Sequence, residues 1–266
     1  MSQLIRWGIL GTGGIADSFV TDLLAVGLTI TAVGSRTQES ADAFATKFGI
    51  ATAHGSYEAL VADPAVDVVY VATPHPFHAA NSLLAIAAGK HVLVEKAFTL
   101  NGAEAERIAV AAEQAGVVVM EAMWTRFLPH MVRIREIIAA GTLGDVRTVI
   151  ADHGQKLPAD PRHRINDPAL GGGGLLDLAI YPISFAVDIL GLPTRVLASA
   201  TMTATGVDRQ TALIFEHEGG RQSISQSALD ASGPVRGAVI GTDAWIDIDR
   251  WWYGPTTFTV TTRSTT

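Results

Sequence analysis

A glycine-rich turn separates the first apolar run of the chain from the first amphipathic stretch, and it restricts the fold more than any other feature. Residues 4–10 form a short apolar run that stops at Gly11-Thr12-Gly13-Gly14-Ile15-Ala16, and residues 14–26 carry apolar side chains at helical spacing. In such a turn the first glycine permits a tight bend, the second lets the backbone approach a phosphate, and a small third residue lets helix and strand pack closely. The alternative is an ordinary strand-to-helix turn. The order of strand, glycines and helix favours a dinucleotide pyrophosphate held at the helix N-terminus.

The alternation of apolar strand and helix continues through residues 1–122. Strands are expected at residues 29–34, 67–72, 91–94 and 117–121, and helices at 38–48, 76–89 and 102–115. Strands that are apolar throughout and alternate with helices indicate a parallel sheet covered on both faces. We therefore predict an N-terminal Rossmann domain over residues 1–122.

The pattern changes after residue 122. Helices are expected at residues 129–140 and 175–190, a strand at 146–151, and a long loop rich in proline and glycine at 158–174. Segments of alternating polarity follow at residues 195–205, 210–217, 221–229, 238–248 and 256–262. We therefore predict an α/β protein whose second domain, residues 123–266, has a mostly antiparallel sheet.

Composition excludes several classes of protein. The formal net charge of −7 disfavours nucleic acid and anionic membrane as partners, because both reward clustered Lys and Arg. The chain has no cysteine, so it has no disulfides and no thiolate nucleophile. No unbroken apolar run reaches the ~18 residues of a membrane helix, and no signal peptide is recognisable at the start, so we expect a cytoplasmic protein. No histidine stands in a metal-ligand spacing such as H-E-x-x-H, so no metal is expected.

The end of the second strand discriminates between the two nicotinamide dinucleotides. An enzyme that uses NAD usually carries Asp or Glu there, which accepts a hydrogen bond from the ribose 2′-hydroxyl. This chain carries Ser35 and Arg36 instead. A guanidinium suits a 2′-phosphate, although Arg36 can also be a solvated loop residue. The residues favour NADP, and NAD use stays possible.

Two further segments follow expected strands at the edge of the sheet where ligands collect in such folds. One is Thr73-Pro74-His75-Pro76-Phe77-His78, and the other is Glu95-Lys96. Lys96 is either a group that points into the crevice or a surface lysine paired with Glu95, and its position leaves the two open.

Four segments resemble the glucose–fructose oxidoreductase/inositol dehydrogenase (Gfo/Idh/MocA) family over nearly the whole chain. They are residues 11–16, residues 73–78, residues 88–96 (Ala-Gly-Lys-His-Val-Leu-Val-Glu-Lys) and residues 170–182, which include four consecutive glycines. Residues 121–129 are most similar to the branch of dimeric dihydrodiol dehydrogenase and NADP-linked xylose dehydrogenase. The resemblance implies that the sheet of residues 123–266 is open and that this domain serves substrate binding and dimerisation. It also implies a small-molecule substrate, and a homodimer or higher homo-oligomer formed through the free face of the C-terminal sheet.

The resemblance also implies the catalytic groups. The family lysine falls on Lys96, and the family D-x-x-x-Y pair falls on Asp177 and Tyr181. Four residues apart on a helix, Asp177 and Tyr181 share a face, so both are expected to meet Lys96 above the nicotinamide. Tyr181 is then the general acid/base, with its phenolate favoured by the Lys96 cation, and Asp177 orients the pair or binds a hydroxyl. The alternative places Tyr181 in a core and pairs Asp177 with an arginine.

The remaining expected contacts follow from the same positions. The cofactor is expected to contact Gly11, Thr12, Gly13, Gly14, Ile15, Ser35, Arg36, Ala72, Thr73, Pro74, His78, Glu95, Lys96 and Arg126. The substrate is expected to contact His75, Trp124 and Arg164.

The chain departs from the family pattern in two places. Ala97 stands where the family has proline, often after a cis peptide bond. A cis bond before alanine costs about 3 kcal/mol, so we expect a different backbone at Lys96. The C-terminus is also shorter than in the family, by roughly 60 residues in this comparison.

We conclude from the sequence that the chain is an NADP(H)-dependent dehydrogenase that transfers a hydride between the nicotinamide and a hydroxyl or carbonyl carbon of a sugar-like or cyclic diol substrate. A non-catalytic NADP-binding sensor of the same fold is the alternative, but such proteins tend to lose the lysine or the tyrosine. An inactive shortened form is the third interpretation.

Overall fold

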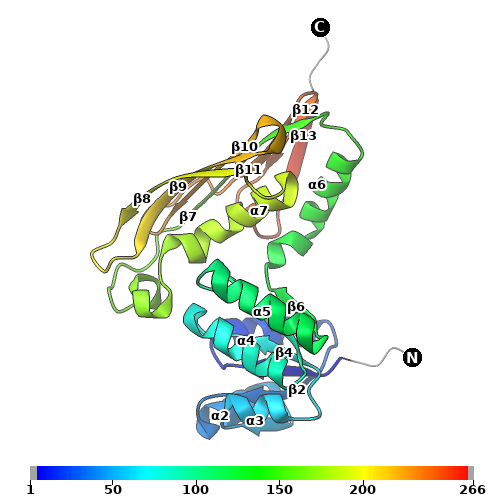
Figure 1. Ribbon diagram of the computed structural model, residues 1–266, viewed down its shortest axis with the longest axis vertical. Helices are drawn as coiled ribbons and strands as arrows, with labels where there is room; N and C mark the ends of the chain where they lie inside the picture. The colour runs from blue at the N-terminus through cyan, green and yellow to red at the C-terminus, as the bar shows by residue number, and fades with distance from the viewer. Residues whose placement is uncertain (1–4, 263–266) are drawn as a thin grey trace. The chain divides into compact units, whose positions relative to one another are not determined.

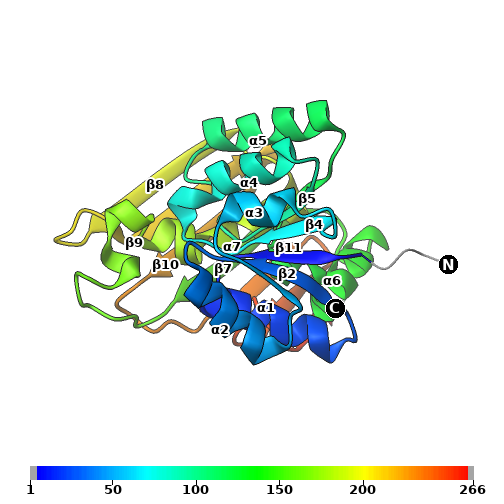
Figure 2. The same cartoon turned by 90° about the horizontal axis from the view of Figure 1, so that it is seen from below.

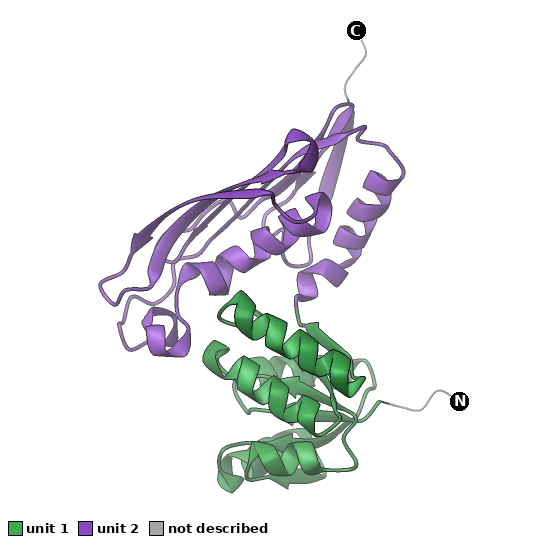
Figure 3. Ribbon diagram, in the orientation of Figure 1, with its two compact units in different colours: residues 1–122 green, residues 123–266 purple. Residues whose placement is uncertain are grey.

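The computed structural model describes residues 5–262, which fall into two compact units divided between Ala122 and Met123 (Figure 3). Each unit is built on one β-sheet. The fold is α/β, with a parallel sheet in the first unit and a mixed, mostly antiparallel sheet in the second, as the sequence predicts.

The first unit is a six-stranded parallel sheet in the order β3-β2-β1-β4-β5-β6, the order of a dinucleotide-binding fold. Its strands are β1 (Trp7–Leu10), β2 (Ile30–Gly34), β3 (Thr52–His54), β4 (Val68–Val71), β5 (His91–Val94) and β6 (Val119–Glu121). Its helices are α1 (Gly14–Ala25), α2 (Gln38–Phe48), α3 (Tyr57–Ala62), α4 (His78–Ala87) and α5 (Gly102–Ala115), and a 3₁₀ turn covers His75–Phe77.

The helices cover both faces of this sheet because its strands are apolar on both sides. Figure 2 shows α1 and α2 below the sheet and α3, α4 and α5 above it. One core holds Ile9, Val33 and Tyr70 against α1 and α2. The other holds Leu10, Val71 and Val94 against α3, α4 and α5, and the two cores fix the strand ends that carry the loops.

The second unit holds a seven-stranded sheet in the order β13-β12-β11-β7-β10-β9-β8, in which only β7 and β10 pair in parallel. Its strands are β7 (Val146–Gly154), β8 (Arg195–Met202), β9 (Asp208–His217), β10 (Arg221–Ala228), β11 (Gly237–Gly241), β12 (Ala244–Ile248) and β13 (Phe258–Thr262). Its helices are α6 (Pro129–Ala139) and α7 (Ile180–Leu190), and α7 follows a π-helical turn at Leu175–Ala179.

The helix α7 lies along one face of this sheet, as Figure 1 shows. Tyr181 and Phe185 on α7 pack in one core with Val149 of β7, Val239 of β11 and Trp252. The opposite face carries side chains that stay exposed, among them Ile150, Ile214 and Ile224.

Three expectations about local structure need correction. The sequence-based prediction lacked β3 and α3, because a three-residue strand and a six-residue helix are too short to show a period. Residues 238–248 form two strands of a hairpin instead of one segment. The predicted helix at residues 175–190 begins as a π-helical turn, so Asp177 lies in that turn and Tyr181 in the α-helix.

Candidate active site

The glycine turn after β1 has the geometry of a phosphate cradle. Gly11 has a φ of +108°, and a Cβ there would lie 3.0 Å from the carbonyl oxygen of Ala72, so a side chain is excluded by both backbone conformation and space. A Cβ at Gly13 or Gly14 would meet nothing within 4 Å. The turn is therefore open on the side that a ligand approaches.

The N-terminus of α1 differs from those of α2, α3 and α5. The helices α2, α3 and α5 are each capped by a side chain, from Thr37, Ser56 and Asn101 respectively. The N-cap residue of α1 is Gly13, so no side chain caps this helix. Its first-turn N–H groups are therefore left for an external acceptor, and an anion suits them because the helix dipole is positive there. The residues fit a dinucleotide pyrophosphate.

The end of β2 presents a cation with no carboxylate partner. Arg36 is exposed and makes no ion pair with any of residues 5–262. Its charge lowers the pKa of Tyr57, which burial raises more strongly. Ser35 is buried beside it, and its Oγ lies 3.3 Å from Thr12 Oγ1. This arrangement fits a phosphate on the adenosine ribose.

The loop after β4 is held against β1 by the bond from Ala72 N to Leu10 O, 2.9 Å long. Its next residues, Thr73 and His75, are buried, and Thr73 Oγ1 accepts a 3.1 Å bond from Asn81 Nδ2. The ring of His75 meets the ring of His78 edge to face, with 5.5 Å between centroids.

The side chain of His78, an expected cofactor contact, is engaged with the protein's own backbone. The residue is fully buried, and its two ring nitrogens lie 2.8 Å from the carbonyl oxygen of Ala97 and 2.7 Å from that of Thr73. Burial lowers the pKa of the ring, and the two carbonyls act in the opposite direction. His78 therefore joins the loop after β4 to the loop after β5.

Lys96 follows β5 in a closely bonded segment. The carboxyl group of Glu95 accepts the hydroxyl of Tyr70, and its second oxygen accepts the Lys96 N–H at 3.2 Å. Burial raises the pKa of Glu95, while Tyr70 and Lys96 lower it. The Lys96–Ala97 peptide bond is cis. The expectation that alanine would change the backbone here is therefore wrong.

In the second unit, Asp177 and Tyr181 are both nearly buried. The segment that carries them starts at Leu175, whose N–H donates to Asp208 Oδ2 at 2.7 Å. Arg164 lies 3.5 Å from Asp177 Oδ1, so the arginine pairing that the sequence left open does occur, at long distance.

Tyr181 stands in a cluster of polar aromatic side chains. Trp124 Nε1 donates to the Tyr181 hydroxyl oxygen at 3.2 Å. The rings of His153 and Tyr253 both lie 5.1 Å from the Tyr181 ring, between centroids. Gln155 Nε2 lies 2.8 Å from His153 Nε2 and 3.1 Å from the Tyr253 hydroxyl.

Sequence reasoning missed His153, Gln155 and Tyr253 as site residues. His153 and Gln155 come from the end of β7, and Tyr253 lies about one hundred residues further along the chain. No local pattern brings these segments together; the bond from Trp252 Nε1 to Asp152 O, 2.9 Å long, ties the loop of Tyr253 to the end of β7.

Arg126 lies in the second unit, and its guanidinium bonds Asp188 Oδ1 at 2.5 Å. Arg135 bonds the other oxygen of the same carboxylate. The predicted cofactor contact of Arg126 therefore requires a group that is already paired.

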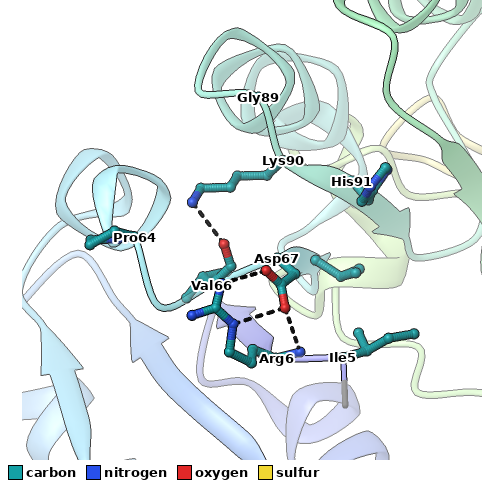
Figure 4. A pocket seen from close by; sticks show the side chains of 9 residues that line it. Ile5, Arg6, Pro64, Val66, Asp67, Gly89, Lys90 and His91 are labelled. Carbon is teal, nitrogen blue, oxygen red and sulfur yellow. Dashed lines mark hydrogen bonds and ion pairs between the residues drawn. The ribbon is translucent and has the colours of Figure 1, made fainter. Parts of the chain in front are cut away.

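One hollow of the first unit lies away from the residues described above. A hollow of about 470 Å³ opens at the amino ends of β4 and β5, opposite the glycine turn (Figure 4). Its charged groups are paired, because Arg6 binds Asp67 and Lys90 donates to the carbonyl oxygens of Asp63 and Val66.

Within residues 5–262, no group of three or more His, Asp or Glu side chains is arranged to hold a metal ion.

One helical stretch, Pro168–Leu190, is long and apolar enough to cross a membrane by length and composition alone. Of its most apolar window, 56% is buried inside the structure, as in the core helix of a folded domain.

Comparison with known proteins defines the class. Residues 5–123 match the model of an oxidoreductase family with an NAD-binding Rossmann fold, and residues 131–247 match the GFO/IDH/MocA C-terminal domain. Trans-1,2-dihydrobenzene-1,2-diol dehydrogenase of Mus musculus is 39% identical over 253 residues, which cover 93% of this chain and 75% of that protein. D-xylose 1-dehydrogenase (NADP(+)) of Hypocrea jecorina is 42% identical over 241 residues, 79% of this chain and 61% of that protein.

A solved structure extends the comparison to the whole fold. A 3-ketoreductase from Actinomadura kijaniata, in complex with NADP and TDP-benzene, superposes with a TM-score of 0.88 at 26% identity. The match covers 99% of this chain and 83% of that one. The fold, the glycine turn and these matches define a Rossmann-type oxidoreductase. The chain belongs to the GFO/IDH/MocA oxidoreductase family, and the resemblance seen in the sequence is confirmed.

Proposed function

We propose that the protein is an NADP(H)-dependent dehydrogenase that acts on a CH–OH carbon of a sugar-like or cyclic diol substrate. Relatives named as a dihydrodiol dehydrogenase and an NADP-linked xylose dehydrogenase support this substrate class. The similar ketoreductase, whose structure was solved in complex with NADP, supports the cofactor. Residues 1–122 are proposed to bind the dinucleotide, and residues 123–266 to bind the substrate.

The residues of the first unit divide the cofactor among them. The open turn at Gly13 and Gly14 and the uncapped N-terminus of α1 are proposed to hold the pyrophosphate, and Arg36 to hold the 2′-phosphate. Ile15 is 48% exposed at this turn, so it offers an apolar surface to the cofactor. When bound, NADP supplies or accepts the hydride.

The observation that carries the catalytic proposal is the setting of Tyr181. Its phenol oxygen accepts an indole N–H from Trp124, a bond that strengthens when that oxygen carries negative charge. We propose that Tyr181 exchanges the proton of the substrate hydroxyl, that Lys96 supplies a cation to the same oxygen, and that Asp177 binds or orients the substrate. These roles agree with the lysine and D-x-x-x-Y positions of the family.

A substrate scan tests the proposal. NADPH formation is followed with D-xylose and with trans-1,2-dihydrobenzene-1,2-diol, for the wild type and for Tyr181→Phe. We expect turnover of at least one substrate by the wild type and a loss of at least about 100-fold in the variant, as for removal of an acid/base group. NADP binding without turnover in the wild type favours the sensor of the same fold. An active Tyr181→Phe overturns the role of the tyrosine.

We further propose that the protein forms a homodimer through the exposed face of its second sheet. Strand register aligns Leu197, Ile214, Ile224 and Ile150 in one row across β8, β9, β10 and β7. Each of these side chains is between 38% and 42% exposed. A flat apolar row on paired strands suits an identical row in a second copy. The cytoplasmic location stays a prediction.

Light scattering after size exclusion tests the dimer. Ile224→Asp is expected to shift the protein toward the monomer, because a carboxylate is placed in the middle of the row. Val110→Asp is a matched control, since Val110 is 45% exposed on α5 of the other unit. A monomeric wild type, or a dimer unaffected by Ile224→Asp, contradicts this interface.

A further inference from the structure

The hydroxyl of Tyr253 is oriented by a chain of hydrogen bonds whose directions can be deduced. The carbonyl oxygen of Leu178 can only accept, so His153 Nδ1, 3.2 Å away, carries a proton. The other ring nitrogen of His153 then accepts from Gln155 Nε2, because an amide nitrogen only donates. The same amide nitrogen donates its second proton to the Tyr253 oxygen at 3.1 Å.

It follows that the Tyr253 oxygen already accepts one bond and must direct its own proton elsewhere. No bond from this hydroxyl to an acceptor is found among residues 5–262. Burial raises the pKa of Tyr253, and the neighbouring Tyr181 raises it further, so the phenol keeps its proton at neutral pH. Tyr253 therefore presents a fixed O–H donor.

The backbone around Tyr253 is held in place by its own bonds. Its carbonyl oxygen accepts the hydroxyl of Thr125 at 2.6 Å, and the carbonyl of Trp252 lies 3.0 Å from His130 Nε2. Trp251 has a φ of +64°, a left-handed conformation that is uncommon for a large side chain. Such conformations persist where the surroundings determine them, often at ligand sites.

Two phenols thus stand side by side, with ring centroids 5.1 Å apart, and each oxygen accepts an N–H from a neighbour. Exposed indole rings flank them, because Trp124 and Trp251 are 42% and 43% exposed and meet the Tyr253 ring edge to face. Two neighbouring phenols suit a ligand that carries two neighbouring oxygens, and the exposed aromatic rings suit its carbon skeleton.

We propose that Tyr253 determines specificity by donating to the oxygen on the carbon next to the reacting one, so that the substrates are vicinal diols or their hemiacetal equivalents. The inference rests on the proposed function, in which Tyr181 handles the reacting oxygen. Tyr253 binds the oxygen on the neighbouring carbon, and Gln155 is a positioning residue that orients the Tyr253 hydroxyl. A compound with an isolated hydroxyl leaves the Tyr253 donor without an acceptor, which is unfavourable in a desolvated site.

A matched pair of substrates tests the proposal. D-xylose and 2-deoxy-D-xylose differ only in the oxygen next to the anomeric carbon, and kcat/KM is measured for both with NADP. The wild type is expected to prefer D-xylose by about 10-fold or more, as for one hydrogen bond to a neutral donor. Tyr253→Phe, which keeps the ring stacked on His153, is expected to bring the ratio near one.

The positioning role of Gln155 is tested in a double-mutant cycle. Gln155→Leu is expected to lower the preference in the same direction, and Gln155→Leu combined with Tyr253→Phe to be no worse than Tyr253→Phe alone. Gln114→Leu, on the exposed surface of α5, is the matched control and should change nothing.

The outcomes separate this inference from the proposed function. An active wild type whose preference for D-xylose survives Tyr253→Phe overturns the role of Tyr253 and leaves the dehydrogenase proposal standing. A wild type that binds NADP but oxidises neither sugar nor the dihydrodiol overturns the proposed function, and the vicinal-diol inference with it.

Discussion

Replacing Gly13 by alanine should separate cofactor binding from folding. The backbone there has φ −81° and ψ 179°, which alanine adopts freely, and the new methyl group would meet nothing within 4 Å. The free energy of unfolding without cofactor should therefore stay within about 0.5 kcal/mol of the wild type. The methyl group does occupy the space through which a pyrophosphate reaches the N–H groups of α1.

The loss of binding follows from the bonds that the methyl group blocks. A hydrogen bond to a charged group contributes about 1.5–3 kcal/mol, so losing one or two should weaken NADP binding roughly 100-fold. Titration of intrinsic tryptophan fluorescence measures the Kd, and urea unfolding measures stability.

Two other glycine variants serve as comparisons for Gly13→Ala. Gly102→Ala, also in open space at the start of α5, should change neither quantity. Gly11→Ala should lower stability by about 1–3 kcal/mol, because φ is +108° and the Ala72 carbonyl is 3.0 Å from the added atom. Unchanged NADP affinity in Gly13→Ala would refute the assignment of the turn as the phosphate site.

Three more perturbations address the cofactor phosphate and the bonds that support the site. Arg36→Ala should weaken NADP binding about 10-fold or more and leave NAD binding and stability unchanged. The exposed control Arg107→Ala should not weaken NADP binding. Equal loss of affinity for both cofactors in Arg36→Ala contradicts a 2′-phosphate role. Burial raises the pKa of Glu95, so the folded state holds that proton more tightly than the unfolded state, and the free energy of unfolding falls as pH rises above the unfolded value of 4.5. Glu95→Gln should therefore gain in stability relative to the wild type as the pH rises above 4.5 in urea titrations, and a pH-independent difference opposes this reasoning. Asp208→Ala removes the acceptor of the Leu175 N–H and should lower stability by about 1–2 kcal/mol and reduce kcat, whereas wild-type kcat would deny it a positioning role.

The parallel sheet and the glycine turn could be predicted because their signals are local. An apolar run that stops at Gly11 and resumes as a helix after Gly14 has few other solutions, and the same holds for the runs that became β4 and β5. The strand β3 escaped prediction because three half-buried residues at a sheet edge carry no period.

The candidate site likewise has residues with a local signal in the sequence and residues without one. The sequence can propose Arg36 and Lys96 because each lies just after a recognisable strand. The polar cluster around Tyr181 carries no local signal, since Gln155 and Tyr253 come from segments that are distant in sequence and that the bond from Trp252 Nε1 to Asp152 O ties together. The position of His78 beside the sheet edge suggests a ligand contact, whereas its buried ring lies against two backbone carbonyls.

The cis bond before Ala97 could not be predicted from the sequence, for a different reason. The intrinsic preference of an alanine peptide is for trans, yet the segment after β5 is cis. The surrounding bonds, from His78 to Ala97 and from the Phe98 N–H to Glu121, set the path of this backbone and are invisible in the sequence.

The most direct test of the central claim is the turnover of Lys96→Met measured together with its NADP affinity. We expect the Kd for NADP to change little, since the phosphates are held at α1 and Arg36, while NADPH formation with an accepted substrate falls by at least about 100-fold. Turnover close to that of the wild type, with NADP bound, would contradict the assignment of Lys96 as the cation that supports proton exchange by Tyr181.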